Sequence, residues 1–581
     1  VLGIDALALS ARRDKYHLKD IKPLPRRKLL EKVPLMDCFT APCKGGCPIH
    51  QDIPEYIELC RKGAYASALR LITEKNPLPF ITGTICAHNC MTKCMRNYYD
   101  EPVNIRATKL VAAEKGYDAY MSKITPPAPV TDGRKVAVIG GGPTGMSAAY
   151  FVGRAGIPVT LFEKADRLGG IVRQVIPAFR ISDEAIDKDV ALMEKMGVEV
   201  KLNTEAPSVA ELKAQGYTHI FFAVGAWKAG RLDIPGNVVP VIGWLRDMKA
   251  GKDVSLGHVA VVGGGNTAMD AARAALRAGA KSSTLVYRRT KKYMPADAEE
   301  LEMAIADGVE FLELVAPVEQ KDGKLICEKM KLGDPDDKGR RKPVPTGEMV
   351  EIPCDTVVSA VGEKVESEVF TRNGITVDEK GIPAFKTNLE GVYAGGDAMR
   401  GPATVVEGIA DAQYFANAVI GEAHKFAIPA KAVATREEAV AKKGVLCESA
   451  KCEGDRCLTC NVVCQVCADV CPNRANVVIE LPDGRQQILH VDRMCNECGN
   501  CAVFCPYDSA PYREKFTLFL TREGFDESVN NQGFLPLGGK KVLVRLDSKV
   551  FEADLDAKND LPADIEVFIW TVLTKYAYLM G

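Results

Sequence analysis

The clearest pattern of hydrophobic and polar positions lies between residues 136 and 163. Four apolar residues, Val136–Ile139, predict a buried strand, and the small residues that follow Pro143 predict a helix packed against it. A second stretch, Val159–Phe162, is apolar apart from Thr160 and predicts the next strand, which ends at Glu163. This order of strand, turn, helix and strand is typical of a unit in a parallel sheet.

Comparable strand patterns recur along the chain, separated by stretches with helical periodicity. A helical stretch at residues 53–73 precedes them and is interrupted at Asn76-Pro77. Residues 516–581 alternate apolar and polar positions, which predicts a small hairpin and a terminal helix. Further strands are predicted at residues 221–225, 258–262, 284–287 and 357–362, the last as the strand by which the chain returns to the first unit.

The turn after the first strand matches the pattern G-x-G-x-x-G. Its first glycine permits a tight turn, its second lets a pyrophosphate approach the backbone, and its third lets helix and strand pack closely. The helix N-terminus offers N–H groups to phosphates, and the acid at the end of the second strand can accept bonds from a ribose. A glycine-rich turn without a ligand is the alternative. The candidate residues are Gly140, Gly142, Pro143, Thr144, Gly145 and Glu163.

A second turn of this kind follows the strand at residues 258–262 and has the form G-x-G-x-x-A. The strand after it ends in two arginines rather than an acid, and two guanidiniums can grip a 2′-phosphate. The pattern therefore favours NADPH over NADH. A solvated basic turn is the alternative, because Lys291 and Lys292 follow. The candidate residues are Gly263, Gly265, Asn266, Thr267, Ala268, Arg288 and Arg289.

Composition narrows the class of protein. The chain has 581 residues, of which 47% are hydrophobic. Its formal net charge of −1 shows no excess of basic residues of the kind that nucleic-acid-binding proteins have. No apolar run reaches the ~18 residues that a membrane-spanning helix needs. No signal peptide is visible, but the chain begins at Val1 rather than at methionine, so this absence carries little weight.

Twenty cysteines are the unusual feature of the composition, and most of them fall in two groups. The first group has the spacing C-x4-C-x3-C-P followed by C-x3-C-x3-C, which is typical of iron–sulfur clusters. Disulfides suit small secreted chains, and scattered buried thiols have no reason to gather in this way. Clusters favour a reducing, cytoplasmic location. The candidate ligands are Cys38, Cys43, Cys47, Cys86, Cys90 and Cys94.

The second group, near the C-terminus, follows the pattern of bacterial two-cluster ferredoxins, in which the fourth cysteine of each run ligates the other cluster. Zinc is the alternative metal, since C-x2-C pairs also bind it. Cys457 could replace Cys460 in the first run, and Cys447 and Cys452 have no assigned role. The pattern gives one [4Fe–4S] cluster to Cys471, Cys495, Cys498 and Cys501. It gives the other to Cys460, Cys464, Cys467 and Cys505.

These motifs together resemble a family of iron–sulfur flavoproteins. Residues 38–110, the first glycine pattern and the strand that ends in Gly395-Gly396-Asp397 resemble the small subunit of glutamate synthase. They also resemble the NADPH-side subunit of ferredoxin:NADP transhydrogenases and the N-terminal half of dihydropyrimidine dehydrogenase. The stretches that begin at Asp37, Asn76 and Val470 narrow the resemblance, over nearly the whole chain, to the YgfK-type selenate reductase subunits.

The resemblance implies FAD at the first glycine pattern and NADPH or NADH at the second. It also implies that the chain leaves the FAD unit after residues 221–225 and returns to it later. The further residues that it places around the flavin are Gly170, Arg180, Gly396 and Asp397.

The resemblance also implies two [4Fe–4S] clusters in the first cysteine group. One would be held by Cys38, Cys43 and Cys94, and the other by Cys47, Cys86 and Cys90. Two family ligands are replaced here, by Leu35 and Lys109, so each cluster lacks one ligand. Asp37, His88, Glu101 or a partner protein could supply it, and the alternative is that one of the two clusters is absent.

The sequence therefore predicts an α/β fold in which two Rossmann-like domains, for FAD and for NAD(P)H, lie between two iron–sulfur domains. The predicted parts are an N-terminal helical iron–sulfur domain (1–124), an FAD domain in two segments (125–240 and 355–430), an NAD(P)H domain (241–354), a ferredoxin-like domain (440–515) and a C-terminal hairpin and helix (516–581).

The predicted function is that of an FAD-dependent NAD(P)H oxidoreductase subunit with about four [4Fe–4S] clusters. It would pass electrons to other redox subunits or to ferredoxin, with electron bifurcation as a further option. The alternative is a non-catalytic electron-wiring or assembly subunit that docks a molybdenum or flavin enzyme. Neither reading involves nucleic acid or a membrane span.

Overall fold

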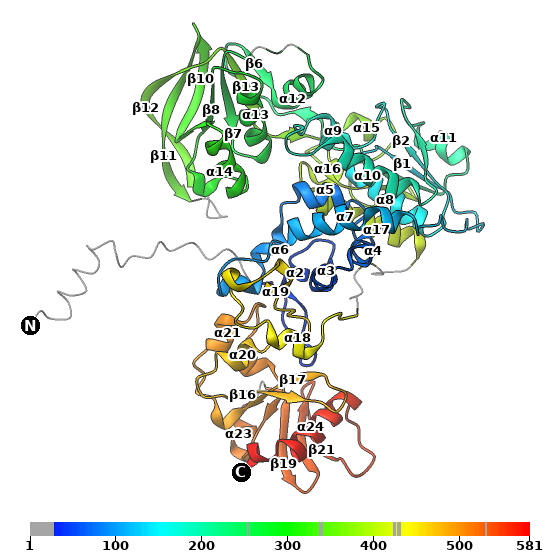
Figure 1. Ribbon diagram of the computed structural model, residues 1–581, viewed down its shortest axis with the longest axis vertical. Coiled ribbons are helices and arrows are strands. Elements are labelled where there is room, and N and C mark those ends of the chain that lie inside the picture. The colour runs from blue at the N-terminus through cyan, green and yellow to red at the C-terminus, as the bar shows by residue number, and fades with distance from the viewer. Residues whose placement is uncertain are drawn as a thin grey trace, which may run out of the picture.

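The computed structural model describes residues 28–252, 254, 256–335, 341–421, 426, 431–528 and 531–581. The N-terminal helices lie in the middle of the molecule (Figure 1). Two sheets of the nucleotide-binding type lie on one side of these helices, and the C-terminal sheet lies on the other side.

The first sheet has the strand order β15-β4-β1-β2-β3, and all of its strands are parallel. Its central strands form from short apolar runs, because both faces are covered by helices. Helix α8 packs against α17, which places the N-termini of both helices near the end of β1. The elements are β1 Val136–Ile139, α8 Pro143–Arg154, β2 Val159–Phe162, α9 Gly170–Gln174, α10 Asp183–Glu194, β3 Glu199–Lys201, α11 Val209–Ala214, β4 His219–Phe222, α15 Glu368–Thr371, β15 Val392–Ala394, α16 Asp397–Arg400 and α17 Val405–Ile420.

The second sheet has the order β6-β13-β7-β8-β9, and a three-stranded antiparallel sheet extends beside it. A short ribbon of β5 and β14 connects the two sheets. The elements are β5 Lys228–Ala229, β6 Val238–Pro240, α12 Val241–Lys249, β7 His258–Gly263, α13 Asn266–Arg277, β8 Ser282–Tyr287, η3 Lys291–Tyr293, α14 Ala298–Ala306, β9 Glu310–Glu313, β10 Val315–Lys321, β11 Lys324–Pro335, β12 Arg341–Pro353, β13 Thr356–Ala360 and β14 Glu363–Lys364.

Strand β13 corrects one prediction from the sequence. The apolar run at residues 357–362 was expected to return the chain to the first sheet, but β13 pairs with β6 and β7 in the second sheet. The return follows β13 and runs through β14 to β15. A buried strand that ends in glycine reads alike in either sheet, because its partners are distant in sequence.

The N-terminal region is a helical layer packed on the first sheet's helices. Asp189 of α10 accepts bonds from the backbone N–H groups of Phe80 (3.1 Å) and Ile81 (2.8 Å), so α10 caps the N-terminus of α5. This contact fixes the N-terminus of α5 relative to the first sheet, and Cys86 follows the other end of this short helix. The elements are α2 Pro42–Gly45, α3 Ile53–Arg61, α4 Tyr65–Thr73, α5 Pro79–Ile85, α6 Asn89–Thr92, η2 Met95–Tyr98 and α7 Ile105–Met121.

The C-terminal region is built on one six-stranded sheet of order β16-β17-β18-β19-β20-β21. The predicted boundary at residue 515 falls within this fold, because β18–β21 continue the sheet of β16 and β17. The elements are α18 Arg436–Ala441, η5 Cys447–Ser449, α19 Glu453–Arg456, α20 Val466–Asp469, β16 Asn476–Glu480, β17 Gln486–Val491, η6 Asp492–Met494, α21 Asn500–Phe504, α22 Pro511–Glu514, β18 Thr517–Leu518, α23 Arg522–Glu527, β19 Gly533–Gly538, β20 Lys541–Leu546, β21 Lys549–Asp554, α24 Ala563–Lys575 and η7 Ala577–Met580. None of the described helices is long and apolar enough to span a membrane.

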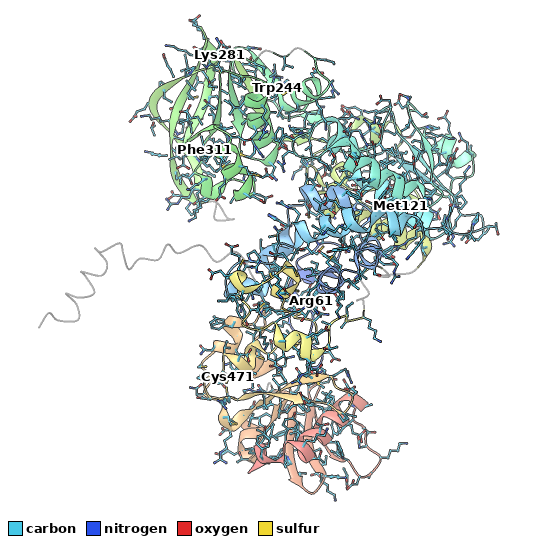
Figure 2. The ribbon with its side chains drawn as sticks, viewed as in Figure 1. Arg61, Met121, Trp244, Lys281, Phe311 and Cys471 are labelled. Atoms are coloured by element: carbon cyan, nitrogen blue, oxygen red, sulfur yellow. The ribbon has the colours of Figure 1, made fainter. Side chains whose placement is uncertain are left out.

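A buried ion-pair network joins the N-terminal helices to the segment that enters the C-terminal region. Glu58 of α3 is 1% exposed and pairs with Arg61 (2.6 Å) and with Lys442 (2.5 Å), which follows α18. Figure 2 shows Arg61 where the two regions meet. Burial raises the pKa of Glu58, but hydrogen bonds from Arg61 and Lys442 outweigh it and lower that pKa to about 2.

We expect Glu58→Gln to destabilise this junction by about 3–5 kcal/mol, because it leaves the buried Lys442 without its carboxylate partner and removes one partner of Arg61 and of Lys62. Since the folded pKa of Glu58 is depressed, its contribution is present above about pH 4.5 and is lost as the pH falls toward 2. Thermal denaturation of the two chains at neutral pH measures the difference. Glu438→Gln is the control: its side chain is 31% exposed, and its pairs should contribute less than about 1 kcal/mol. Equal midpoints for wild type and Glu58→Gln would contradict the account.

Candidate functional site

A cavity of about 490 Å³ lies where the first sheet, the second sheet and the N-terminal helices meet. Its walls include the turn between β1 and α8, the N-terminus of α13, and the short segment between α5 and α6. The two glycine patterns therefore open on a shared space. Ile85 and Ala87, which flank Cys86, line the same space.

The first glycine pattern has the geometry that a dinucleotide requires. Gly140 has φ +104°, and a Cβ there would lie 2.5 Å from the carbonyl oxygen of Ala223. A Cβ on Gly145 would lie 1.9 Å from the carbonyl oxygen of Gly140, so glycine is needed for helix α8 to approach β1. Gly142 differs, because among the described residues its Cβ would meet only the Cα of Gly170, at 3.8 Å. Gly142 thus leaves open the space before the N-terminus of α8, which fits a pyrophosphate.

Glu163 is held at the end of β2 as the pattern predicts. Its two carboxylate oxygens accept bonds from the backbone N–H groups of Gly141 (2.6 Å) and Ala165 (2.7 Å). The side chain is 7% exposed and lines the cavity. Each oxygen keeps a further lone pair, so the carboxylate can accept bonds from ribose hydroxyls.

Gly396 and Asp397 bring the end of β15 to the opposite wall of the cavity. Asp397 lines the cavity and accepts a bond from the N–H of Ala403 (3.0 Å). Burial raises the pKa of Asp397 to about 7. The side chain of Thr144 lies against Gly396, where a Cβ would meet its hydroxyl at 2.3 Å. Residues from the two segments of the first sheet therefore meet at this wall, and with the open space at Gly142 they fit FAD.

Arg180 lines the cavity. Its side chain is paired with acidic residues of the helices on the second sheet, and it is not left unpaired where the flavin was expected. Its guanidinium pairs with Asp270 of α13 and with Glu300 of α14 (2.6 Å). Burial raises the pKa of Asp270 to about 6, and the guanidinium of Arg180 opposes that shift. Sequence reasoning missed Asp270 and Glu300. The sequence feature that could have identified Asp270 is the presence of an acidic residue among the alanines of α13. Gly170 lies against Gly142, as expected for a cavity wall.

The second glycine pattern repeats the geometry of the first. A Cβ on Gly263 would lie 2.3 Å from the carbonyl oxygen of Ala360, whereas no heavy atom of the described chain lies within 4 Å of a Cβ on Gly265. Asn266 is fixed by the backbone N–H of Asp297 (3.0 Å), and Asn266 and Thr267 line the cavity. Ala268 is fully buried in the packing of α13 against the sheet.

Arg288 and Arg289 follow β8, at the end of the strand beside the second glycine pattern. Arg288 is exposed, and Arg289 is half-buried with its Nε donating to the carbonyl oxygen of Arg341 (3.2 Å). At this edge of a Rossmann-type sheet, side chains contact the ribose of a bound dinucleotide. Both arginines are thus placed where a 2′-phosphate could reach them.

The cysteines of the two sequence groups meet in the structure. A second, small cavity is lined by cysteines from both groups, with apolar side chains and Arg96 completing its wall. All twenty cysteines are described and none forms a disulfide. The cysteines that line this cavity are Cys43, Cys94, Cys457 and Cys460.

Cys38 lies with the C-terminal region instead of with Cys43 and Cys94. Burial, followed by the charge of Cys38, raises the pKa of the Cys464 thiol to about 12. Cys38 also raises the pKa of Cys467 and of Cys505, after burial and other groups. Cys38 therefore lies within electrostatic reach of three cysteines of the ferredoxin pattern.

The remaining cysteines form two further sets. Cys47, Cys86 and Cys90 interact with one another and with the ammonium of Lys109, next to the large cavity. Cys471, Cys495 and Cys501 interact near the surface, where Cys498 is exposed. The backbone N–H groups of Ala475 and Glu497 donate to the sulfur atoms of Cys471 (3.2 Å) and Cys495 (3.3 Å). Figure 2 places Cys471 at the top of the C-terminal region, on the side of the N-terminal helices.

The side chains that might have replaced the missing ligands are engaged elsewhere. Asp37 accepts a bond from Gln487 (2.6 Å), and His88 lies 3.2 Å from Glu299. Glu101 is exposed, and Leu35 packs in the core of the C-terminal region. Among the described residues, no three His, Cys, Asp or Glu side chains converge as a single metal ion would require.

Comparison with known proteins agrees with this geometry. Residues 134–412 match the family model of the pyridine nucleotide-disulphide oxidoreductases, and residues 32–119 match that of dihydropyrimidine dehydrogenase domain II with a 4Fe-4S cluster. The small chain of NADPH glutamate synthase from Halomonas elongata is 32% identical over 64% of this chain and 86% of its own length. The chain belongs to the family of NAD(P)H-dependent iron–sulfur flavoprotein oxidoreductases that contains this small chain.

Two further relatives narrow the position within the family. The oxidoreductase named YgfK from Escherichia coli K12 is 41% identical over 100% of this chain. The chain spans 59% of the length of that relative. The beta subunit of an NADP-dependent formate dehydrogenase from Moorella thermoacetica is 36% identical over 64% of this chain and 58% of its own length.

Proposed function

We propose that this chain accepts reducing equivalents from NADPH and delivers them, through FAD and about four [4Fe–4S] clusters, to a partner redox protein. FAD, when bound, accepts a two-electron hydride and releases single electrons. One observation carries the proposal: the first glycine pattern, Asn266 and Thr267 of the second pattern, and the residues beside Cys86 line the same cavity. The chain's own residues would thus hold donor, flavin and first electron acceptor together.

The arrangement of the cysteines supports a single line of transfer. Both cysteine groups lie on the same side of the first sheet, because the C-terminal region packs on the N-terminal helices (Figure 1). Sequence order had left open two exits, one on each side of the flavin domain. We propose a linear relay in preference to bifurcation, since two branches require two separate acceptor sites at the flavin.

We propose that the partner docks where the last cysteine set reaches the surface. Cys498 is exposed there, and the neighbouring Val503 and Phe504 are 64% and 40% exposed. An exposed apolar surface beside a redox centre favours a protein acceptor, such as another redox subunit or ferredoxin. The relatives named as a small chain and as a beta subunit are themselves parts of larger enzymes, which supports this partner class.

Anaerobic mixing of the purified chain with NADPH tests the proposal. Flavin absorption should bleach, and it should do so faster with NADPH than with NADH. If neither nucleotide changes the flavin spectrum, the chain is not an NAD(P)H oxidoreductase and its dinucleotide folds are structural.

We predict that the double substitution Arg288→Ala and Arg289→Ala reverses the nucleotide preference. It should raise the KM for NADPH at least about tenfold, because each lost charge-assisted bond to a 2′-phosphate is worth about 1–3 kcal/mol. The KM for NADH should hardly change. The matched control is Lys291→Ala with Lys292→Ala, which removes the same charge from the same exposed turn. Equal effects of the arginine change on both nucleotides would show that these arginines do not read the phosphate.

A further inference from the structure

The sequence patterns divide the cysteines by their position along the chain, but the structure mixes the two groups. Cys43 follows the N-terminus of α2, and Cys94 precedes η2, in the helical layer. Cys457 follows α19, and Cys460 lies three residues further, in the segment that leads into the C-terminal sheet. All four line the same small cavity.

We propose that Cys43, Cys94, Cys457 and Cys460 hold one [4Fe–4S] cluster, which the N-terminal helices and the C-terminal cysteine-rich segment share. This assignment rests on the proposal that the chain carries such clusters. It supplies the ligand missing at Leu35 from within the chain, so no partner protein is needed to complete the site.

The packing around Cys457 supports a built site rather than a chance contact. Cys457 is 7% exposed and belongs to the hydrophobic core of the N-terminal helices, against which Cys43 and Cys94 also pack. Helix α19, which ends just before Cys457, packs against α3. Its Arg456 donates to the carbonyl oxygen of Glu101 (2.7 Å), which follows η2. The C-terminal segment thus places Cys457 and Cys460 against the helical layer.

The loop between Cys457 and Cys460 is shaped for ligation. Thr459 is 2% exposed and has φ +45°, a left-handed conformation that is unusual for threonine. This turn lets both flanking thiols face one cavity. Arg96 lines the cavity and pairs with Asp100, and the buried Lys442 pairs with Glu58 of α3, the helix against which α19 packs. Cations near a site favour the negative charge of a thiolate-bound cluster.

The position of Cys38 follows from the opposite arrangement, in which an N-terminal segment packs on the C-terminal region. Residues 28–40 lie on the C-terminal region: Leu29 pairs with Tyr507, Lys515 donates to the carbonyl oxygen of Pro34 (2.8 Å), and Asp37 binds Gln487. This segment delivers Cys38 to Cys464, Cys467 and Cys505. Cys38 then takes the place in the ferredoxin pattern that Cys460 leaves.

Because each of the two regions contributes cysteines to a site in the other, the four proposed clusters form one series instead of two separate pairs. Cys47, Cys86 and Cys90 lie at the large cavity, the shared site follows, then the Cys38 set, and the set with Cys498 ends at the surface. Tyr507 ties the second and third sites together, because its hydroxyl, two residues after Cys505, donates to the carbonyl oxygen of Thr40, which lies between Cys38 and Cys43.

Iron analysis of the full-length chain and its variants tests the proposal. Four clusters would give about sixteen irons per chain in the wild type. Cys43→Ala and Cys457→Ala should each lose up to about four irons, and the double variant should lose no more than either single one. A loss of about eight irons in the double variant, or full iron in Cys457→Ala, would overturn the shared site. Cys452→Ala, an exposed cysteine of the same segment, is the control and should keep all its iron.

A second pair of variants covers the case in which alanine prevents folding. A carboxylate can still bind iron, so Cys43→Asp and Cys457→Asp should keep the cluster and alter its electron paramagnetic resonance signal. Both should alter the same signal, and changes in two different signals would contradict the proposal. Bleaching of the flavin by NADPH, measured in the same samples, tests the proposed function separately, because that step does not use the shared cluster.

Discussion

Gly142→Val should purify without flavin while the chain remains folded. Gly142 has an extended backbone (φ −76°, ψ 179°), which valine adopts without strain. Of the described atoms, only the Cα of Gly170 comes within 4 Å of the new Cβ, at 3.8 Å, so the protein itself can accept the side chain. The two methyl groups would instead occupy the space before α8, where we place the pyrophosphate of FAD.

Flavin content per chain, measured after acid release of the flavin, gives the result. We expect nearly stoichiometric FAD in the wild type and nearly none in the variant, with an unchanged circular dichroism spectrum. Gly145→Val is the contrasting variant: its Cβ would collide with the carbonyl oxygen of Gly140, so it should fail to fold. A Gly142→Val chain that retains full FAD would show that the pyrophosphate lies elsewhere.

Gly265→Val should keep FAD but lose reduction by NADPH. The position matches Gly142 in geometry: it is the N-cap of α13, its backbone is extended (φ −97°, ψ 172°), and no described atom lies within 4 Å of a Cβ there. We expect the rate of flavin reduction by NADPH to fall about 100-fold, which corresponds to a loss of ~3 kcal/mol. The two variants together separate the binding of flavin from the binding of nucleotide.

Anaerobic stopped-flow absorbance measures this rate. A chemical reductant should still bleach the flavin of Gly265→Val at the rate seen in the wild type, because it does not use the nucleotide site. Unchanged reduction by NADPH would place the nicotinamide nucleotide outside the second glycine pattern.

The parts of the fold that depend on local pattern could be predicted from the sequence. The strands Val136–Ile139 and Val159–Phe162 were predicted with their observed bounds, because each short run is bounded by residues that end a buried strand: Lys135 and Gly140 for the first, Pro158 and Glu163 for the second. The parts that depend on distant pairing could not. Strand β13 was assigned to the wrong sheet, and the continuity of β18–β21 with β16 and β17 was missed. Neither of these strand pairings can be recognised from the residues of the strand alone.

The residues of the candidate site likewise fall into two sets, those whose geometry follows from local spacing and those that tertiary packing brings together. Gly140, Gly145 and Glu163 act within one strand–turn–helix unit, so their spacing was enough to predict their geometry. Cys38 and Cys457 are each carried to their neighbours by a segment that packs on another region of the chain. Spacing along the sequence cannot show which thiols meet after such an exchange. The pairing of Arg180 with Asp270 likewise depends on how two sheets are placed relative to each other.

Freeze-quench electron paramagnetic resonance after anaerobic mixing with NADPH follows the whole proposed path in one measurement. In the wild type, we predict that signals of reduced clusters arise as the flavin absorption bleaches, and that Gly265→Val shows neither change on the same timescale. If the flavin bleaches and the clusters stay oxidised, electrons do not pass from the flavin into the cysteine sites. If NADPH changes neither signal in the wild type, the proposed oxidoreductase function is contradicted.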